Sequence, residues 1–424
     1  MVRIFDYLLI IVCYTTFGHK LNTICSLKQY RAYLILKEYF AVRNRLPLFY
    51  TVTAFFWFAL YAYVPYVAPF ADEMGADFRL SGLIVGAYGF TQMVIRFPLG
   101  ILSDKLGKRK IFVLMGVFFS ALSGLVIVFF PTPMALLAAR SLGGVAASAW
   151  VIFAILGASY YRPEETVKSV GFLNAANAFG RMAALLVGGL IAERFGFSAA
   201  FLLAGLVGLI GLVSGMGIVE NTGVKGKTPS LSDLLDVARN RQLMCASILG
   251  IFIQYIMFAT TFGFSPMAAA EMGASNIQLG LLGVASTLPG LLVSPLAGTV
   301  LSRKIGRTLA IGFILAGLGS AAVALSQSLW HLYVVQIISN IGAAAVFTLL
   351  MGLCIQDIPS ERRATAMGFF QAVYGVGMFL GPFIMGWVSH SFGLMFAFAF
   401  TGTIGIIGMG VSVFFIKWGY LRYL

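Results

Sequence analysis

The chain has 424 residues, of which 60% are hydrophobic and only 10% are charged, and its formal net charge is +14. A soluble globular protein of this length needs a larger polar surface, so this composition excludes that class and indicates an integral membrane protein. The bases gather in the loops between apolar runs, and the positive charge therefore does not indicate a nucleic-acid partner.

Residues 1–47 are predicted to form an N-terminal cytoplasmic or interfacial extension. Its apolar run, residues 7–18, is too short to span a bilayer, and no small-residue cleavage site follows it. Two interpretations remain for residues 1–45: an interfacial helix, or translation from an upstream start that the mature protein does not use.

Twelve longer apolar runs follow. About 20 helical residues cross a hydrocarbon core of about 30 Å, whereas a barrel strand needs only about ten, so the runs predict transmembrane helices. The sequence therefore predicts an all-α membrane protein, with helix cores at residues 48–70, 80–101, 111–130, 134–158, 169–192, 198–219, 243–268, 277–299, 309–327, 331–355, 365–388 and 394–416.

The distribution of Lys and Arg predicts the orientation of the helices. With the amino terminus inside, only Arg79 and Arg194 fall in outer loops, while the inner loops are rich in bases. This positive-inside asymmetry predicts a multi-pass protein of the cytoplasmic (inner) membrane with both termini in the cytoplasm.

Two segments of the chain repeat. Residues 171–201 match residues 368–398 at a constant offset, and residues 98–109 are echoed by residues 295–307. The chain is therefore expected to contain two copies of one six-helix bundle, at 48–220 and 243–416, with a cytoplasmic linker at 221–242 and a cytoplasmic tail at 417–424. Two parallel six-helix repeats are typical of secondary transporters, in which the halves rock around a shared site.

Three motifs carry a resemblance to a known family. The loop after the second run follows the pattern G-x-L-x-D-[RK]-x-G-[RK]-[RK], through Gly100, Leu102, Asp104, Lys105, Gly107, Lys108 and Arg109. The fourth run follows L-x-x-x-R-x-x-q-G through Leu136, Arg140 and Gly144, with Gly143 in place of the usual glutamine. The eleventh run contains the glycine pattern of Gly368, Gly377, Gly381, Pro382 and Gly386.

On these residues the chain resembles the major facilitator superfamily over residues 48 to 416. The resemblance implies twelve helices in two bundles, transport by alternating access and no cofactor. In the family the glycine pattern stands in helix five and marks antiporters, chiefly drug exporters. Here helix five keeps Gly171 and Gly180 but has Ala184 and Leu185 where Gly-Pro belongs. The glycines Gly171, Gly180, Gly368, Gly377 and Gly381, with Pro382, are expected to pack helices closely.

The charged loop is a predicted gate, formed by Gly100, Asp104, Lys105, Gly107, Lys108 and Arg109. Asp104 can accept bonds from the backbone amides of a neighbouring helix start or pair with Arg, and either contact can break when the halves move. The alternative is that the bases are membrane anchors, and we prefer this interpretation for Lys110.

Charges within the apolar runs indicate the transport site. Every acid lies in a loop or at a helix end, whereas Arg96, Arg140 and Arg181 lie within runs, where each Arg costs about 2.5–3.5 kcal/mol or more without a partner or water. Helical spacing places Asn174 and Asn177 on the face of Arg181. The predicted substrate-binding residues are Arg181, Arg140, Asn174, Asn177, Tyr61, Gln254, Tyr255, Gln371 and Tyr374.

Two interpretations remain for Arg140 and Arg181: they bind an anionic group of the substrate, or they brace the bundle through backbone carbonyls. We expect a monomeric secondary transporter that exports a small organic anion or zwitterion, coupled to protons or a counter-anion and surrounded by lipid. The alternatives are a multidrug/proton antiporter and a non-transporting sensor on a transporter scaffold. The sequence predicts no enzyme, no metal site and no nucleotide loop, since the corresponding residue clusters are missing.

Overall fold

The computed structural model describes residues 46–161, 165–220, 236–299, 304–359 and 362–421. The predicted N-terminal extension and most of the predicted linker lie outside these ranges. The contacts divide the chain into Met1–Pro47 and Leu48–Leu424, and apart from the first two residues of α3 the second unit carries the features that follow.

All regular secondary structure in the described ranges is helical. The first half of the chain contains α3 (Leu46–Tyr61), η1 (Val64–Tyr66), α4 (Val67–Glu73), α5 (Phe78–Leu106), α6 (Arg109–Phe129), α7 (Pro133–Ser148), α8 (Trp150–Ala158), α9 (Thr166–Phe195) and α10 (Phe197–Gly215). The second half contains α12 (Arg241–Ala259), η3 (Thr260–Phe264), α13 (Ser265–Glu271), α14 (Asn276–Thr299), α15 (Ile305–Ala322), η5 (Val323–Leu325), α16 (Leu329–Gln356), α17 (Arg363–Phe392) and α18 (Leu394–Lys417).

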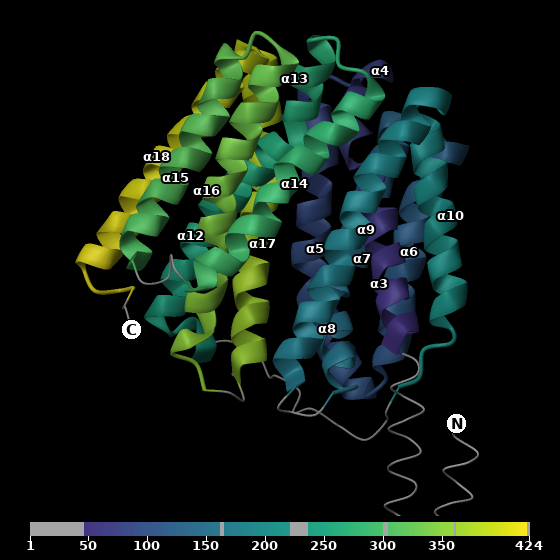
Figure 1. Cartoon of the computed structure of the whole chain (residues 1–424), viewed down its shortest axis with the longest axis vertical. Helices are drawn as coiled ribbons and strands as arrows, with labels where there is room; N and C mark the ends of the chain where they lie inside the picture. Colours follow the sequence, from purple (N-terminus) through teal and green to yellow (C-terminus); the bar gives the residue numbers. More distant parts are fainter. Residues whose placement is uncertain (1–45, 162–164, 221–235, 300–303, 360–361, 422–424) are drawn as a thin grey trace, which may run out of the picture. The chain divides into compact units, whose positions relative to one another are not determined.

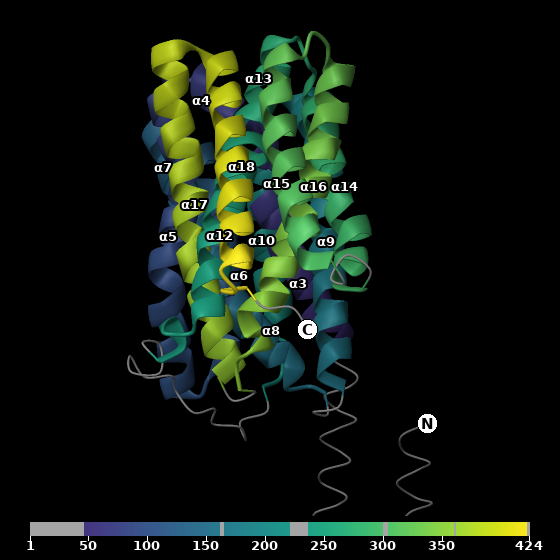
Figure 2. The same cartoon turned by 90° about the vertical axis from the view of Figure 1, so that its left-hand side faces the viewer.

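Twelve stretches of the described chain are long and apolar enough to cross a membrane, which confirms the predicted fold class. Three spans contain more than one α-helix: α3 with α4, α7 with α8, and α12 with α13. Figures 1 and 2 show the spans running side by side, with α4 and α13 at one end and α8 near the other. We call these the α13 end and the α8 end.

Capping residues define the ends of several helices. Asp77, Thr132 and Asn240 accept bonds from backbone amides at the starts of α5, α7 and α12, at 2.8, 3.2 and 2.9 Å. These N-caps satisfy amides that the helix itself leaves free. Gly107 ends α5 with φ +60°, a left-handed conformation that favours glycine.

The two halves of the chain meet through α5 with α17 and α9 with α14. A β-carbon on Gly82 would collide with the carbonyl oxygen of Pro382 and lie 3.0 Å from the Cα atom of Gly386. A β-carbon on Gly280 would lie 2.5 Å from the carbonyl oxygen of Leu185 and 3.2 Å from the Cα atom of Gly189. The helix backbones therefore touch directly, as small residues in membrane helices allow.

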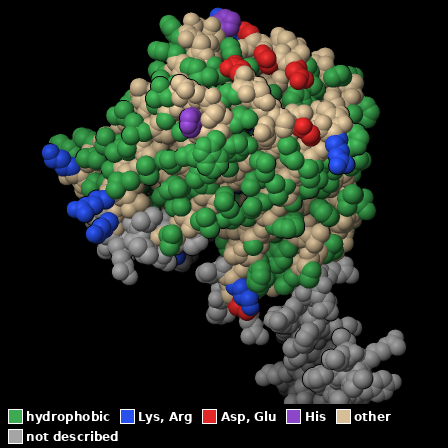
Figure 3. Space-filling view, turned by 45° about the horizontal axis from the view of Figure 1, so that its top comes forward, with side chains coloured by type: hydrophobic (Ala, Val, Ile, Leu, Met, Phe, Trp, Pro, Cys, Tyr) green, Lys and Arg blue, Asp and Glu red, His purple; other side chains and the backbone are tan. Residues whose placement is uncertain are grey.

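These two contacts are related by the sequence repeat. At the offset of 171–201 to 368–398, Leu185 and Gly189 correspond to Pro382 and Gly386. The segments around Gly82 and Gly280 also correspond, since Glu-Met-Gly-Ala precedes both, at 73–76 and 271–274. Both contacts lie toward the α13 end, where Figure 3 shows acidic side chains above a broad hydrophobic surface. The α13 end is therefore closed by two repeat-related helix contacts.

Candidate functional site

Arg140 lies in α7 with only 2% of its surface exposed. Its guanidinium carbon stands 4.7 Å from the centre of the Tyr88 ring, a cation–π contact. Nε and Nη1 of Arg140 are buried without a hydrogen-bond partner. Within the described residues no ion pair involves this side chain. The structure therefore presents a buried cation that the protein only partly compensates.

A small cavity adjoins Arg140. Its volume is about 10 Å³, which is room for one water-sized ligand. Residues of both halves of the chain line it: Leu60, Tyr61, Val64, Tyr88, Arg140, Phe258 and Phe262. The walls are almost entirely aromatic or aliphatic, and Arg140 contributes the charge.

Arg181 lies in α9 and is half-buried. Its guanidinium carbon stands 4.2 Å from the centre of the Tyr61 ring, and its Nε has no hydrogen-bond partner. Tyr61 also contacts Trp57 and Phe262, with ring centroids 5.8 and 6.1 Å away. Because Tyr61 also lines the Arg140 cavity, this one ring connects the surroundings of the two arginines.

Other predicted binding residues carry unpaired polar atoms. The buried atoms without a partner include Asn177 Oδ1, Gln254 Oε1, Tyr255 Oη and Gln371 Oε1. Buried polar groups normally have partners, so these atoms mark places where water or a ligand can bind. Trp57 Nε1 is unpaired in the same way, although the sequence analysis did not select it.

Two predicted binding residues lie in different surroundings. Asn174 is exposed. Tyr374 is 8% exposed and packs edge-on against Phe347 and Phe370, at centroid distances of 5.5 and 5.2 Å. Arg96, the third arginine within the apolar runs, donates from Nη2 to the carbonyl oxygen of Ala147 at 3.4 Å, a bracing contact between α5 and α7.

The start of α6, directly after the charged loop, is bonded by the carboxylate of Glu220. Glu220 accepts bonds from the backbone amides of Arg109 and Lys110, the second at 3.1 Å. Lys110 Nζ donates to the carbonyl oxygen of Met216, past the end of α10, at 2.7 Å. The start of α6 is therefore bonded by Glu220, a role that the sequence analysis gave to Asp104 as one of two options.

The predicted packing glycines divide into two groups. A β-carbon on Gly180, Gly377 or Gly381 would collide with a carbonyl oxygen of a facing helix. At Gly171 and Gly368, by contrast, nothing lies within 4 Å of the position of a β-carbon. Close packing is therefore absent at these two positions, which lie in the halves of α9 and α17 remote from the closed α13 end.

A buried polar network beside α13 was missed in the sequence. Gln336 Nε2 donates to Ser265 Oγ, and Asn340 Nδ2 donates to Thr261 Oγ1 at 3.1 Å. Thr261 belongs to the π-helical turn η3, a distortion that often marks functional positions. Gln336 and Asn340 are four residues apart in an apolar run, which was the available signal.

Among the polar contacts that join the halves at the α13 end, two are made by equivalent residues of the repeat. His390 Nδ1 lies 3.5 Å from Asp77 Oδ2, and Glu193 Oε2 accepts from the Ile277 amide at 3.1 Å. His390 and Glu193 occupy equivalent positions of the repeat. Both contacts can exist only while this end is closed, because each joins helices of opposite halves.

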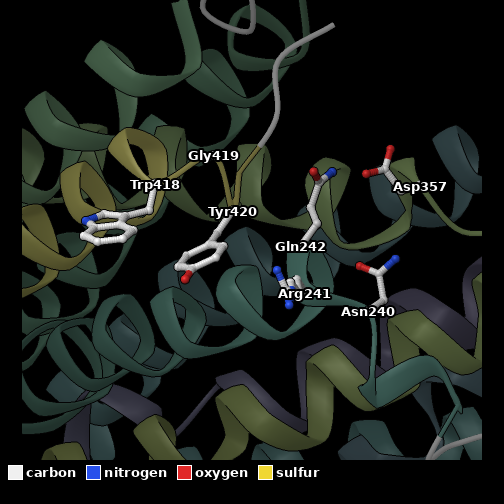
Figure 4. Close-up of a pocket in the computed structure, with 7 residues that line it drawn as sticks. All are labelled: Asn240, Arg241, Gln242, Asp357, Trp418, Gly419 and Tyr420. Carbon is white, nitrogen blue, oxygen red and sulfur yellow. The ribbon is translucent and has the colours of Figure 1, made fainter.

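A wider hollow of about 260 Å³ lies at the ends of α12, α16 and α18, and Figure 4 shows its lining. Arg241 stacks near Tyr420 there, with its guanidinium carbon 5.9 Å from the ring centre. None of the predicted binding residues contributes to this hollow, which is formed by Asn240, Arg241, Gln242, Asp357, Trp418, Gly419 and Tyr420. Trp, Tyr and Arg at span ends are typical of the membrane interface.

Comparison with known proteins places this architecture in a family. The chain matches the Major Facilitator Superfamily over residues 49–264 and 247–419. It is 23% identical to an uncharacterized MFS-type transporter of Methanocaldococcus jannaschii, over 81% of this chain and 90% of the relative. It is 24% identical to the inner membrane transport protein YajR of Escherichia coli, over 75% of this chain and 71% of YajR. The quinolone resistance protein NorA of Staphylococcus aureus is 29% identical over 38% of this chain and 42% of NorA.

Solved structures share the fold at low sequence identity. One is a bacterial homologue of the human lysosomal transporter Spinster, solved in an inward-facing and occupied conformation. It superposes with a TM-score of 0.76 at 14% identity, and the match covers 89% of this chain and 97% of that one. The nucleoside transporter NupG superposes with a TM-score of 0.70 at 17% identity, covering 89% and 100%.

Proposed function

We propose that this chain, which belongs to the major facilitator superfamily, exports a small organic anion or zwitterion. As a member of that family it is a multi-pass secondary transporter of small molecules and not an enzyme. The substrate class and the direction of transport are the proposed part.

The single observation that carries the substrate class is the state of Arg181. Its guanidinium is half-buried in a membrane span, rests on Tyr61 and lacks an acidic partner in the part of the chain that the structure describes. A carboxylate or phosphate of the substrate can bind such a group bidentately. The unpaired oxygens of Asn177 and Gln371 offer acceptors for an ammonium or hydroxyl on a zwitterion.

The conformation supports an alternating-access cycle. With the predicted orientation, the closed α13 end faces outward and the α8 end faces the cytoplasm. Because the α13 end is closed, a substrate can reach the site only from the cytoplasmic side in this state. Opening requires the repeat-related contacts of Gly82 and Gly280 to separate together, because each joins the two halves.

The test is untargeted mass spectrometry of cells and medium, with wild type, Arg181→Ala, Arg181→Lys and empty vector. We expect a carboxylate or phosphate compound to move into the medium only with wild type, and weakly with Arg181→Lys, which keeps the charge but loses the fork geometry. Arg194→Ala, at an exposed arginine in the last turn of the same helix, is the matched control and should transport normally. Export that is unchanged in Arg181→Ala would disprove the proposed site.

A second candidate is a multidrug/proton antiporter. The aromatic frame of Trp57, Tyr61, Tyr88, Phe258 and Phe262 favours it, since such rings bind flat lipophilic cations. The partial similarity to NorA points the same way. In the same experiment this candidate predicts that lipophilic cations move, and that their movement survives Arg181→Ala.

A further inference from the structure

Arg140 requires a compensating group that the described protein does not supply. Its side chain is 2% exposed, its Nε and Nη1 make no hydrogen bond, and its one close partner is the face of Tyr88. An arginine side chain keeps its positive charge in proteins. The charge therefore has to be balanced by something that occupies the adjoining space.

The cavity beside Arg140 limits what that group can be. The space is narrow, at about 10 Å³, and its walls are apolar apart from Arg140 and the two tyrosines. A carboxylate, sulfate or phosphate would leave oxygens without hydrogen-bond donors against these walls. A water would satisfy an N–H group but leave the positive charge unbalanced. A monatomic anion balances the charge and has no further oxygens to satisfy, and the cost of burying it is offset by pairing with the Arg140 guanidinium. Chloride is only somewhat larger than water, so small movements of Leu60, Val64 and Phe262 make room for it.

We propose that Arg140 and this cavity form a binding site for a halide ion, chloride in the cell, separate from the substrate group at Arg181. This inference rests on the proposed function, since it identifies the counter-ion of the same transport cycle.

The walls of the cavity connect the halide to the conformational cycle. Tyr61 and Tyr88 belong to the first half of the chain, and Phe258 and Phe262 belong to the second. The stacked pair Tyr88 and Phe258, with centroids 6.1 Å apart, and the pair Tyr61 and Phe262 close the cavity from opposite halves. Separation of the halves at the α13 end opens these pairs, so the halide is bound in this state and released when that end opens.

The test measures thermal unfolding of the full chain, purified in detergent, at constant ionic strength. Sodium gluconate is replaced stepwise by sodium chloride, sodium bromide or sodium sulfate. We expect Tm to rise with chloride and bromide but not with sulfate. The rise should be lost in Arg140→Gln and kept in Arg181→Gln. Val64→Ile should also abolish it, because the added carbon fills the cavity while Arg140 stays in place.

The outcomes separate this inference from the proposed function. The halide site is overturned if the Tm of the wild type does not respond to chloride. It is also overturned if the response survives Arg140→Gln and Val64→Ile, even where export depends on Arg181. The halide site is supported if the chloride response is lost in Arg140→Gln and in Val64→Ile. This holds whether or not export depends on Arg181. Uptake of radiolabelled chloride into proteoliposomes, driven by an opposing substrate gradient, should follow the same pattern across the variants.

Discussion

Gly82 of α5 and Gly386 of α17 pack so closely that a β-carbon on Gly82 would lie 3.0 Å from the Cα atom of Gly386. The equivalent pair of the repeat, Gly280 and Gly189, is nearly as close at 3.2 Å. Any side chain at these positions would collide with the backbone of the facing helix, and rigid helices cannot move apart easily to make room for it. The closed α13 end therefore depends on residues without side chains.

Gly82→Leu should shift the transporter toward the state in which the α13 end is open. The measurement is the labelling rate of Val64→Cys, a position in the Arg140 cavity, by a membrane-impermeant thiol reagent applied from the side of the α13 end. The four native cysteines are first replaced. We expect labelling to accelerate by about tenfold, which corresponds to about 1.4 kcal/mol in the equilibrium between the two states.

Gly290→Leu is the control for this experiment. Gly290 lies in α14, and nothing lies within 4 Å of the position of its β-carbon. The labelling rate should match that of the protein carrying Val64→Cys alone. Equal rates for Gly82→Leu and Gly290→Leu would show that the Gly82 contact does not control closure.

Glu220 and Asp104 should affect different properties. Glu220→Ala removes the carboxylate that accepts from the amides of Arg109 and Lys110, so the start of α6 loses its cap. By analogy with other helix caps, we expect about 1 kcal/mol of lost stability and a lower Tm. Asp104→Asn should leave Tm nearly unchanged and reduce transport, as expected of a gating residue. The assignment fails if Asp104→Asn lowers Tm as much as Glu220→Ala does.

The sequence predicted the helices because hydrophobic runs of this length have few other structures in a membrane. Their ends were less predictable. The second predicted core stops at residue 101, whereas α5 continues to Leu106 and includes Asp104 and Lys105. Apolar counting ends at the first charges, but a helix continues through the membrane interface until a residue such as Gly107 terminates it.

The site could be predicted only in part. Arg140 and Arg181 were conspicuous because a charge in an apolar run is expensive and rare. Tyr88 and Phe258, which enclose Arg140, could not be distinguished from the many aromatic residues that face lipid. Their role depends on contacts between distant segments, which periodicity within one helix does not encode.

The network of Gln336, Asn340, Thr261 and Ser265 ties α16 to the π-helical turn and α13. Gln336→Leu should lower stability by about 1–3 kcal/mol, because it leaves the buried hydroxyl of Ser265 without a partner. It should also slow transport, since the turn lies where α12 meets α13 and is placed to flex when the α13 end opens. Thermal unfolding and the initial rate of export measure the two effects.

A second substitution tests whether the unpaired hydroxyl is the cause. Adding Ser265→Ala to Gln336→Leu removes the orphaned group, so the double variant should be less destabilised than the sum of the two single variants. Thr403→Ala, which removes an exposed hydroxyl bonded to the carbonyl oxygen of Phe400, is the control and should change Tm little. Strictly additive losses would mean that Gln336 stabilises α16 through its packing rather than through its bond to Ser265.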